Sequence, residues 1–491
     1  MDSNSNSKSA LKATSLFGGV QVYSVLLSLV SSKFVAVLLG PEGTGISGLL
    51  SSTVGIIGMV TALGLGTSAV RDVSAAFSSG DSILFYRKVN VFRRLVWITG
   101  VLGLLSCLLL SPIWSKVSFG NYDYTISFAV LSITLLLGQI SSGQSVVLRG
   151  TRRFKDMAKA SVLGSSIGLL TTIPLYYVMG IDGIVPAMVI SSVVSMTLSY
   201  YFSRKIHVEK VLVTIREVFS EGKLMLQMGF FVAMQGFVNT FVYYLLRVYI
   251  ANVGGMAEVG LYNSGFGMVN MAVGMVFSAM GAEYYPRLSS LANDDKKFSE
   301  AVNQQMNISL LLISPIIALF LLMGPLAIIV LLSEKFLSIT LMIQLIALSM
   351  FLKAPGWCLG FTFLAKADTR AFWINEMLTD VLMLINLVLS YRYFGLNGIA
   401  VGYFVQYLYY VLITGYISHR RYNYQFDYSL LRVYLPQFML CVCIFACVTA
   451  LKGYVGYVLA TLLSSASIYM SYRELNKIVS IKAFVHRTFK R

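Results

Sequence analysis

The chain has 491 residues, of which 57% are hydrophobic and only 12% are charged, and its net charge is +17. Soluble domains carry roughly 25% charged residues, so this composition excludes an ordinary soluble protein and indicates a polytopic membrane protein. The basic residues lie in short segments between apolar runs, which favours a topological origin of the charge over nucleic-acid binding. The five cysteines fall inside apolar runs without metal-ligand spacing, so we expect neither disulfides nor a metal site.

The apolar runs predict an all-α membrane protein with about 14 transmembrane helices, because each run can cross a bilayer and lacks a polar stripe. No cleavage site follows the first run, so we expect it to be a retained span. The predicted spans are 14–39, 45–70, 95–114, 124–148, 157–179, 182–203, 225–251, 257–284, 304–330, 337–363, 371–392, 397–418, 433–451 and 454–472.

The distribution of Lys and Arg predicts the orientation of these spans. With the N-terminus in the cytoplasm, inside segments hold 31 of the 38 basic residues, outside loops hold four and spans hold three. This asymmetry predicts that both termini are cytoplasmic. The longest inside connection, from Arg204 to Lys223, mixes apolar and charged residues, which is typical of an amphipathic helix on the membrane surface. A plain linker would connect the flanking spans equally well.

The sequence repeats itself at an offset of 213 to 217 residues. One constant offset across several turns predicts a parallel duplication, in which two six-helix lobes enclose a central cavity. We assign 1–203 to the N-lobe, 204–224 to a cytoplasmic amphipathic linker, 225–420 to the C-lobe and 421–491 to an added helix pair with a basic tail. The matched positions are Gly45 with Gly260, Arg71 with Arg287, Pro112 with Pro325, Arg153 with Arg370, and Gly183 with Gly398.

The order and spacing of several motifs resemble those of a known family. That family is the polysaccharide branch of the multidrug/oligosaccharidyl-lipid/polysaccharide exporter superfamily, and the chain resembles its O-antigen and capsule repeat-unit flippases. The motifs are Leu39-Gly40-Pro41 with Gly43 through Gly45, the segment Leu63 through Arg71, Leu148-Arg149-Gly150 through Lys155, Val259 through Asn263, and Pro286-Arg287-Leu288.

The resemblance implies a transporter and no enzymatic activity. The implied substrate is an undecaprenyl-diphosphate-linked oligosaccharide, moved from the cytoplasmic to the outer leaflet of the bacterial inner membrane by alternating access. Beyond a coupling ion, Na⁺ or H⁺, it implies no cofactor. The expected partners are the lipid-linked substrate, membrane lipids and other polysaccharide-assembly membrane proteins, with no nucleic acid.

Two cations occupy matching places in the predicted lobes. Lys33 lies in the first span and Arg247 in the seventh, both toward the outer side. A charge within a span is costly, and such residues often mark a substrate path. Both side chains could instead reach the interface by snorkelling. The functional interpretation is that they line the cavity and attract the diphosphate, which Arg binds as a fork and Lys as a point charge.

A second group of charges falls in the predicted C-lobe. Lys353 lies near the middle of span 10, and Glu376 and Asp380 lie one helical turn apart in span 11. The first lobe has leucines near the positions equivalent to Lys353 and Asp380. A Lys353–Asp380 ion pair would make both charges tolerable. The functional hypothesis is a site for proton or cation coupling at the two acids, with Lys353 competing for them or contacting the substrate.

Basic residues also recur at the inner ends of predicted helices. They could serve topology alone or form an inner mouth that captures the diphosphate. These residues are Arg71, Arg152, Arg153, Arg287 and Arg370. Polar residues within spans could contact sugars or join helices. These are Gln139, Gln144, Gln235, Asn239, Tyr243, Asn263, Asn270, Asn375, Tyr403 and Gln406.

Three other functions compete with a flippase. A cation-coupled multidrug exporter of the same superfamily would need acids in the first lobe, where span 1 has Lys33. An integral-membrane polysaccharide polymerase or glycosyltransferase would need catalytic carboxylates in a loop, and no such pair is found in the predicted loops. A non-transporting scaffold would tolerate neutral replacements of its membrane charges.

Overall fold

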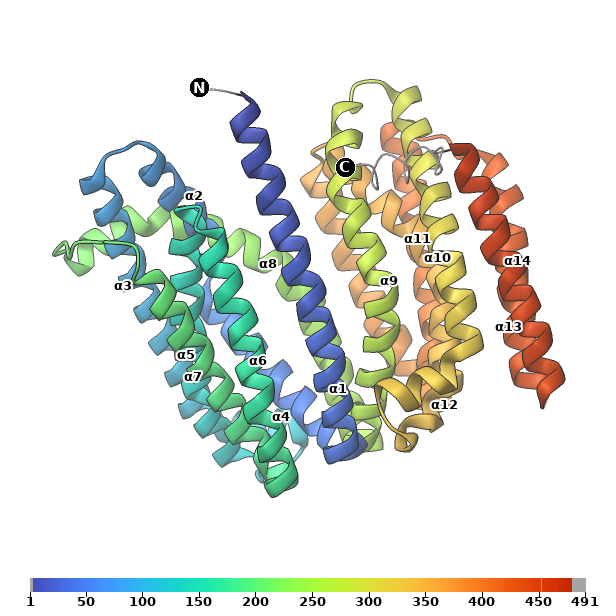
Figure 1. Ribbon diagram of the computed structural model, residues 1–491, viewed down its shortest axis with the longest axis horizontal. Helices are drawn as coiled ribbons and strands as arrows, with labels where there is room; N and C mark the ends of the chain where they lie inside the picture. Colours follow the sequence, from blue (N-terminus) through green and yellow to red (C-terminus); the bar gives the residue numbers. More distant parts are fainter. Residues whose placement is uncertain (1–2, 452, 479–491) are drawn as a thin grey trace. The chain divides into compact units, whose positions relative to one another are not determined.

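The computed structural model describes residues 3–451 and 453–478, with side chains from residue 19 to 477 except residues 232, 235, 282 and 452. Within these residues the backbone forms helices and connecting turns, without a strand (Figure 1). Ten helical elements of the described chain are long and apolar enough to span a membrane, and a helix pair bent by 49° adds an eleventh. Three elements each cover two predicted spans, so together they account for all 14, but the helix of the predicted span 45–70 breaks at Gly64, which has a φ of 63°. The predicted all-α polytopic fold is confirmed.

The chain divides into two compact units, of which unit 1 ends at Gly260 and unit 2 begins at Leu261. Unit 1 includes the helix of the seventh predicted span, because that helix packs against the first three helices of the chain. The units therefore divide the helices differently from the lobes 1–203 and 225–420, which stay a prediction.

The helices of unit 1 pack on near neighbours in the chain and also on distant ones. α3 packs on α5, α5 on α7, α6 on α7, and α1 on α6. Buried Phe92, Leu95 and Val147 belong to its apolar core. Its elements are α1 (Ser3–Ala62), α2 (Leu65–Ser78), α3 (Ser82–Leu109), α4 (Ser111–Phe119), α5 (Thr125–Gly150), α6 (Phe154–Met179), the 3-10 turn η1 (Gly180–Gly183), α7 (Ile184–Ser203) and α8 (Ile215–Gly254), followed by the start of α9 (Met256–Ser290).

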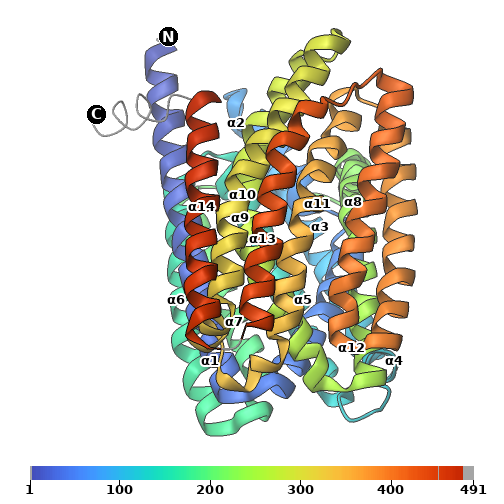
Figure 2. The same cartoon turned by 90° about the vertical axis from the view of Figure 1, so that its right-hand side faces the viewer.

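Unit 2 continues with the rest of α9. α11 packs between α10 and α12, and α13 and α14 lie side by side against α10, as two views show (Figures 1 and 2). Tyr284, Phe298 and Met306 belong to a buried core cluster. The remaining elements are α10 (Asp295–Leu331), η2 (Glu334–Ile339), α11 (Thr340–Ala365), α12 (Thr369–Tyr422), η3 (Tyr428–Leu430), α13 (Leu431–Ala450) and α14 (Tyr454–Ile478).

Two sharp breaks replace predicted loops. Gly40 interrupts α1 with φ 66° and ψ −170°, and Gly395 interrupts α12 with φ 59° and ψ −147°. Glycine adopts such positive φ angles without a Cβ clash. Pro41 then starts the next helical segment, where its missing N–H costs no hydrogen bond. The predicted loop at 40–44 was therefore wrong in length, because one residue suffices to break the helix.

The two glycines that mark the repeat, Gly45 and Gly260, lie at a close backbone contact within unit 1. A Cβ on Gly45 would clash with the carbonyl oxygen of Met256, and a Cβ on Gly260 would clash with that of Pro41. Residues 41 and 256 are 215 apart, as are residues 45 and 260, so the contact is reciprocal at the offset of the repeat. Small residues permit such close helix approach in membranes.

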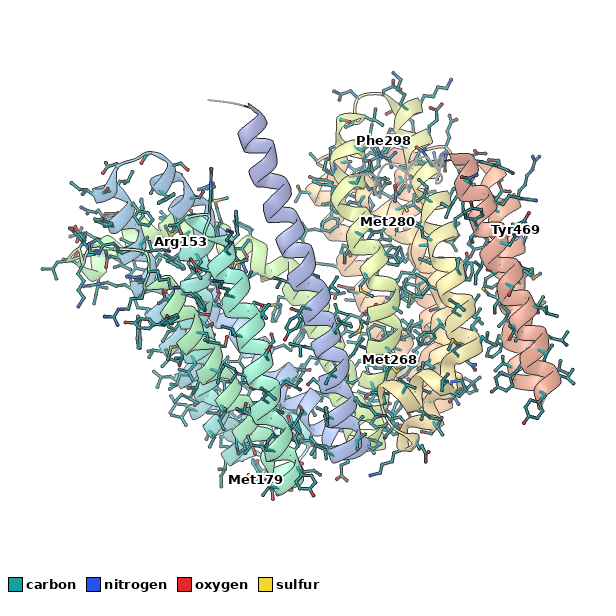
Figure 3. All side chains as sticks on the ribbon, in the orientation of Figure 1. Arg153, Met179, Met268, Met280, Phe298 and Tyr469 are labelled. Atoms are coloured by element: carbon teal, nitrogen blue, oxygen red, sulfur yellow. The ribbon has the colours of Figure 1, made fainter. Side chains whose placement is uncertain are left out.

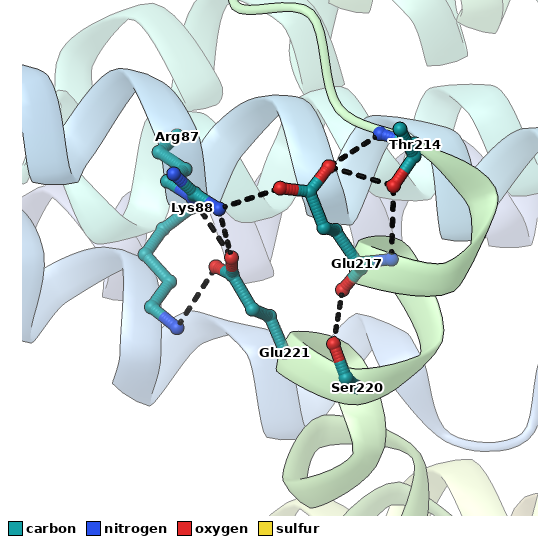
Figure 4. Close-up of polar contacts among 6 residues, drawn as sticks. All are labelled: Arg87, Lys88, Thr214, Glu217, Ser220 and Glu221. Atoms are coloured by element: carbon teal, nitrogen blue, oxygen red, sulfur yellow. Dashed lines mark hydrogen bonds and ion pairs between the residues drawn. The ribbon is translucent and has the colours of Figure 1, made fainter.

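The connection between α7 and α8 is only partly helical. Residues 207–214 have no helical structure, so the predicted amphipathic helix is wrong there, and α8 begins at Ile215. Thr214 caps α8 through a capping box with Glu217. Arg87 of α3 binds Glu217 at 3.1 Å and Glu221 at 2.7 Å, as Figure 4 shows. These ion pairs hold the start of α8 on α3, where a free surface helix would lack such partners.

Candidate functional site

Lys353 lies on α11 in unit 2 and contacts α9 and α12. Its Nζ donates a hydrogen bond to Oδ1 of Asn270 on α9 at 3.0 Å. The same nitrogen lies 5.9 Å from the ring centroid of Phe277 and 5.7 Å from that of Tyr407. An amide oxygen and aromatic faces stabilise an ammonium group without neutralising its charge. Within the described residues, the polar partner of Lys353 is thus an amide, where the sequence suggested the carboxylate of Asp380.

The two acids lie on the first half of α12. Tyr410 Oη donates to Glu376 Oε1 at 2.9 Å, and Asn375 Nδ2 donates to the same oxygen at 3.4 Å. Asp380 is only 8% exposed. Because α12 reverses at Gly395, its second half brings Tyr410 back to Glu376. The donors compensate part of the cost of a carboxylate in a low-dielectric environment.

The surroundings of Lys353 and Glu376 are connected through α12. Tyr407, which contacts Lys353, and Tyr410, which contacts Glu376, lie three residues apart and therefore on one face of the helix. A Cβ on Gly356 of α11 would lie 2.9 Å from Cδ1 of Tyr410, so glycine permits the close packing of these helices. The structure therefore brings Lys353 and Glu376 to one region of unit 2.

A column of aromatic rings supports this region. Tyr262 and Tyr403 share a hydroxyl hydrogen bond of 2.8 Å, and Phe266 stacks on Tyr403 with centroids 5.0 Å apart. Tyr403 stacks in turn on Tyr407, at 5.8 Å. The column runs from α9 to the ring beside Lys353. Buried aromatic contacts of this kind restrict side-chain motion, so they help to hold the lysine in place.

Arg247 of α8 has a specific partner within unit 1. Its Nη1 donates to Ser52 Oγ on α1 at 2.8 Å. Hydroxyl groups next to this bond also join the helices, since Ser118 Oγ lies 3.0 Å from Thr53 Oγ1 and 2.8 Å from Tyr244 Oη. Arg247 is thus oriented against α1, a contact that snorkelling alone does not require.

Lys33 is partly buried in the segment of α1 before the Gly40 break, whereas Ser52 lies after it. Both predicted cations of unit 1 therefore involve the same bent helix. One lies on it, and the other is hydrogen-bonded to it. Their predicted role in diphosphate binding stays a prediction.

The predicted inner-mouth arginines of unit 1 lie near α2 and the start of α6. Arg71 pairs with Asp72 at 3.1 Å, and Arg153 pairs with Asp156 at 3.4 Å. Figure 3 shows Arg153 and Met179 at opposite ends of α6. Arg152 is exposed and has a positive φ of 58° in the turn before α6. Acidic neighbours offset part of the positive charge of Arg71 and Arg153.

The two inner-mouth arginines of unit 2 differ in their contacts. Arg287 pairs with Glu283 at 2.7 Å and donates to Gln305 at 2.8 Å, which ties α9 to α10. Arg370 is exposed in the first turn of α12. Arg287 therefore has a structural contact in addition to any role in capture, while the predicted inner mouth stays a prediction.

Metal coordination finds no support in the described residues, which contain no group of three or more His, Cys, Asp or Glu side chains suited to a metal ion. The charged groups inside the helices are instead dispersed, with hydrogen-bonding neighbours. Such groups can exchange a proton or hold a monovalent ion, and cations can attract an anionic substrate.

Comparison with known proteins identifies the family. The family described as "Polysaccharide biosynthesis protein" matches residues 34–341. The chain belongs to this family. The matched segment contains Arg247, whereas Lys353, Glu376 and Asp380 follow it. The chain is also similar to a Shigella flexneri protein named "Putative O-antigen transporter", with 22% identity over 310 residues, covering 60% of this chain and 70% of the relative.

Solved structures of other proteins have a similar fold. The lipid II flippase MurJ, in an inward closed conformation, matches with a TM-score of 0.72 and 12% identity, covering 94% of this chain and 99% of that one. An inward-facing multidrug resistance MATE family transporter of the MOP superfamily matches with a TM-score of 0.69 and 16% identity, covering 83% and 95%. The matched family and the Shigella flexneri relative confirm the resemblance to polysaccharide transporters found in the sequence, and the two solved structures show that the fold is that of known transporters and flippases.

Sequence reasoning about this family member missed the partners that fix its charges. Asn270 was one polar residue among ten, and only the packing of α9 on α11 shows its bond to Lys353. Lys366 was also missed: its Nζ donates to Asp295 at 2.8 Å, which lowers the pKa of that carboxyl. The sequence feature that could have pointed to this contact is a single Lys at a helix end, and it is too common to predict a partner.

Proposed function

We propose that this protein is a flippase for undecaprenyl-diphosphate-linked oligosaccharides. Membership of a polysaccharide biosynthesis family, a relative named for O-antigen transport and a fold like that of a lipid II flippase support this proposal. The substrate would move from the cytoplasmic to the outer leaflet by alternating access. A diphosphate cannot cross hydrocarbon unaided, because the cost of burying an isolated charge is very large.

The observation that carries the proposal is that the guanidinium of Arg247 lies within an apolar helix and is oriented by its hydrogen bond to Ser52 on α1. An oriented guanidinium suits phosphate oxygens, which it binds in a planar, bidentate manner. Lys33 on α1 would add a second positive charge. Lys353 would act as a third cation on the substrate path, and the arginines at the inner helix ends, Arg71, Arg152, Arg153, Arg287 and Arg370, would collect the diphosphate first.

Translocation would be coupled to an ion gradient at Glu376 and Asp380 in unit 2. The two carboxyl groups lie one turn apart on α12, near the region that holds Lys353. Protonation or Na⁺ binding would neutralise them, and a change of charge in a low-dielectric region can shift a conformational equilibrium. No other cofactor belongs to this proposal.

The proposed location is the bacterial inner membrane, with both termini in the cytoplasm. The strong asymmetry of Lys and Arg between the predicted sides supports this orientation. Membrane lipids would surround the helices, and other polysaccharide-assembly membrane proteins would deliver or consume the lipid-linked unit.

The double variant Lys33→Ala/Arg247→Ala tests the cationic path. We expect at least a tenfold loss of translocation, since each charge-assisted bond to phosphate contributes on the order of 1.5–3 kcal/mol. The leaflet position of the lipid-linked unit and the amount of surface polysaccharide are the measurements, in a host that lacks its own transporter.

The control Lys116→Ala/Lys335→Ala removes the same charge from predicted outside loops and should translocate normally. Full translocation by the Lys33/Arg247 variant, at a normal protein level in the membrane, would contradict the proposed mechanism.

A further inference from the structure

Unit 1 contains a basic cavity that the proposed transport path does not use. Its volume is about 520 Å³, and it lies between α3, α5, α7 and the segment that follows α7. Its lining residues are Arg93, Val96, Trp97, Ile140, Gly143, Gln144, Tyr200, Ser203, Arg204, Ile206, His207, Val208 and Lys210. None of these is Asp or Glu, so within the described residues the lining itself carries no compensating negative charge.

The side chain of Arg93 gives the first indication that the cavity binds a ligand. Its Nε is buried, and it has no hydrogen-bond partner among the described residues. Buried polar atoms nearly always have a partner, and an unpaired donor on a charged group is costly. A ligand with acceptor oxygens in the cavity would supply that partner.

Further donors surround Arg93. Gln144 lines the cavity, and its Oε1 accepts a hydrogen bond from Ser203 Oγ at 2.6 Å, so the amide nitrogen is the group of this side chain that can donate to a ligand. Arg204 and Lys210 add positive charge. Two acids lie close by: the carboxylate of Glu209 is 3.8 Å from the exposed His207, and that of Asp156 is 3.9 Å from Lys205, which is not part of the lining. Among the described residues, neither acid forms an ion pair with Arg93, Arg204 or Lys210.

Aromatic and apolar side chains form another part of the lining. Trp97 and Tyr200 are 54% and 49% exposed on helices that belong to predicted spans. Exposed side chains at such positions face lipid, and Trp and Tyr are enriched where hydrocarbon meets the head groups. In the predicted orientation, residues 71–94 and 204–223 lie on the cytoplasmic side, so the cavity is level with the cytoplasmic leaflet.

We propose that this Arg93 pocket binds the phosphodiester head group of an anionic glycerophospholipid from the cytoplasmic leaflet. The phosphate oxygens would accept from Arg93, Arg204 and Lys210, while the acyl chains would lie against Trp97 and Ile140. Basic pockets between transmembrane helices on the cytoplasmic side commonly bind anionic head groups. The bound lipid would also fasten residues 204–210, which lead to α8.

The test uses the purified full-length protein in a neutral detergent. Phosphatidylglycerol is titrated against phosphatidylcholine with the same chains, and bound lipid is counted by native mass spectrometry. We expect saturable binding of phosphatidylglycerol, which Arg93→Gln should weaken about tenfold, because a hydrogen bond to a charged group is lost. The matched control Arg94→Gln removes the same charge at an adjacent, exposed position outside the lining, and should bind as the unchanged protein does.

Other probes separate the possible sources of phosphate. If inorganic phosphate displaces bound phosphatidylglycerol at the same concentration as free phosphatidylglycerol does, the lipid assignment is overturned in favour of a free anion. Preferential binding of undecaprenyl diphosphate, lost in Arg93→Gln, would overturn it in favour of the transported lipid. Equal phosphatidylglycerol affinity in Arg93→Gln and Arg94→Gln would also overturn it.

If Arg93→Gln does not fold, Arg204→Gln/Lys210→Gln provides the second measurement, since both residues are exposed and follow α7. Unchanged phosphatidylglycerol binding in that double variant would again contradict the proposal.

Discussion

The two units hold their membrane-embedded charges in different ways. In unit 1 the charges singled out within spans are both cations, and Arg247 is hydrogen-bonded to a serine hydroxyl on α1. In unit 2 a cation and two acids lie among tyrosines and asparagines, where Lys353 contacts Asn270 and Glu376 contacts Tyr410. An all-cation set suits an anionic substrate. A mixed set suits a change of protonation or ion occupancy.

This difference shows why the repeat alone is a poor guide to function. The duplicated backbone retains the close contact of Gly45 and Gly260, because helix packing constrains both copies. The charges are not duplicated: leucines stand near the first-lobe positions that correspond to Lys353 and Asp380. Related helices can thus take on separate tasks, and the variants below test whether these tasks are separable.

Asp380→Asn should have the largest effect. It keeps the size of the side chain but removes its ability to ionise, so dependence on a proton or sodium gradient should be lost and driven translocation should fall at least about tenfold. Translocation is measured in membrane vesicles with each gradient imposed separately.

Glu334→Gln is the matched control for that variant, since Glu334 lies in η2 and does not belong to the group of Lys353, Glu376 and Asp380. An unchanged gradient dependence in Asp380→Asn would exclude the proposed coupling role of Asp380 and weaken the contrast with unit 1.

Arg247→Lys should have the next effect, with a loss of about three- to tenfold in affinity for the lipid diphosphate. The positive charge remains, but the planar fork is lost, and Lys and Arg are not equivalent at bidentate sites. Ser52→Ala keeps the guanidinium and removes only its orienting partner, so it should cost less. The affinity of the purified protein for undecaprenyl diphosphate is the measurement that distinguishes Arg247→Lys from Ser52→Ala. Equal affinities of all three proteins would show that unit 1 provides no oriented phosphate site.

Tyr410→Phe should have a moderate effect, confined to unit 2. It removes the hydroxyl that donates to Glu376 and leaves the ring in place. The loss of one hydrogen bond to a carboxylate corresponds to about 1.5–3 kcal/mol, so gradient-driven translocation should fall several-fold. Tyr409→Phe, whose hydroxyl donates to a backbone oxygen, is the matched control. An unchanged translocation rate in Tyr410→Phe would contradict the proposed role of this hydrogen bond.

Glu217→Gln should have the smallest effect and provides a reference for charges outside the membrane. The backbone N–H and hydroxyl of Thr214, and then Arg87, lower the pKa of Glu217 in the folded protein. This carboxylate therefore stabilises the fold above its unfolded pKa of about 4.3, and the contribution is lost as the pH falls through the folded pKa. Thermal unfolding in detergent should show a small loss for the variant at pH 7 that vanishes in acid. A loss that grows in acid would reverse the assigned sign.

Much of the fold was predictable because a bilayer imposes simple rules. Apolar runs long enough to cross it must be helical, since their backbone groups have no water to bind. The spans, the repeat and the resemblance to flippases follow from such runs and their turns. Errors arose where local sequence is ambiguous: one glycine breaks α1 at Gly40, where a loop was predicted, and residues 207–214 do not form the predicted helix.

The sequence by itself determined the class of protein, its span count and which residues carry charge within the spans, because the cost of burying charge makes those residues conspicuous. Only the tertiary structure decided their partners. Asn270 meets Lys353, Tyr410 meets Glu376 and Ser52 meets Arg247 across 83, 34 and 195 residues of chain. Periodicity places a side chain on a helix face, but the packing of one helix on another decides what that face contacts, and hydrogen bonds form only over a few ångströms.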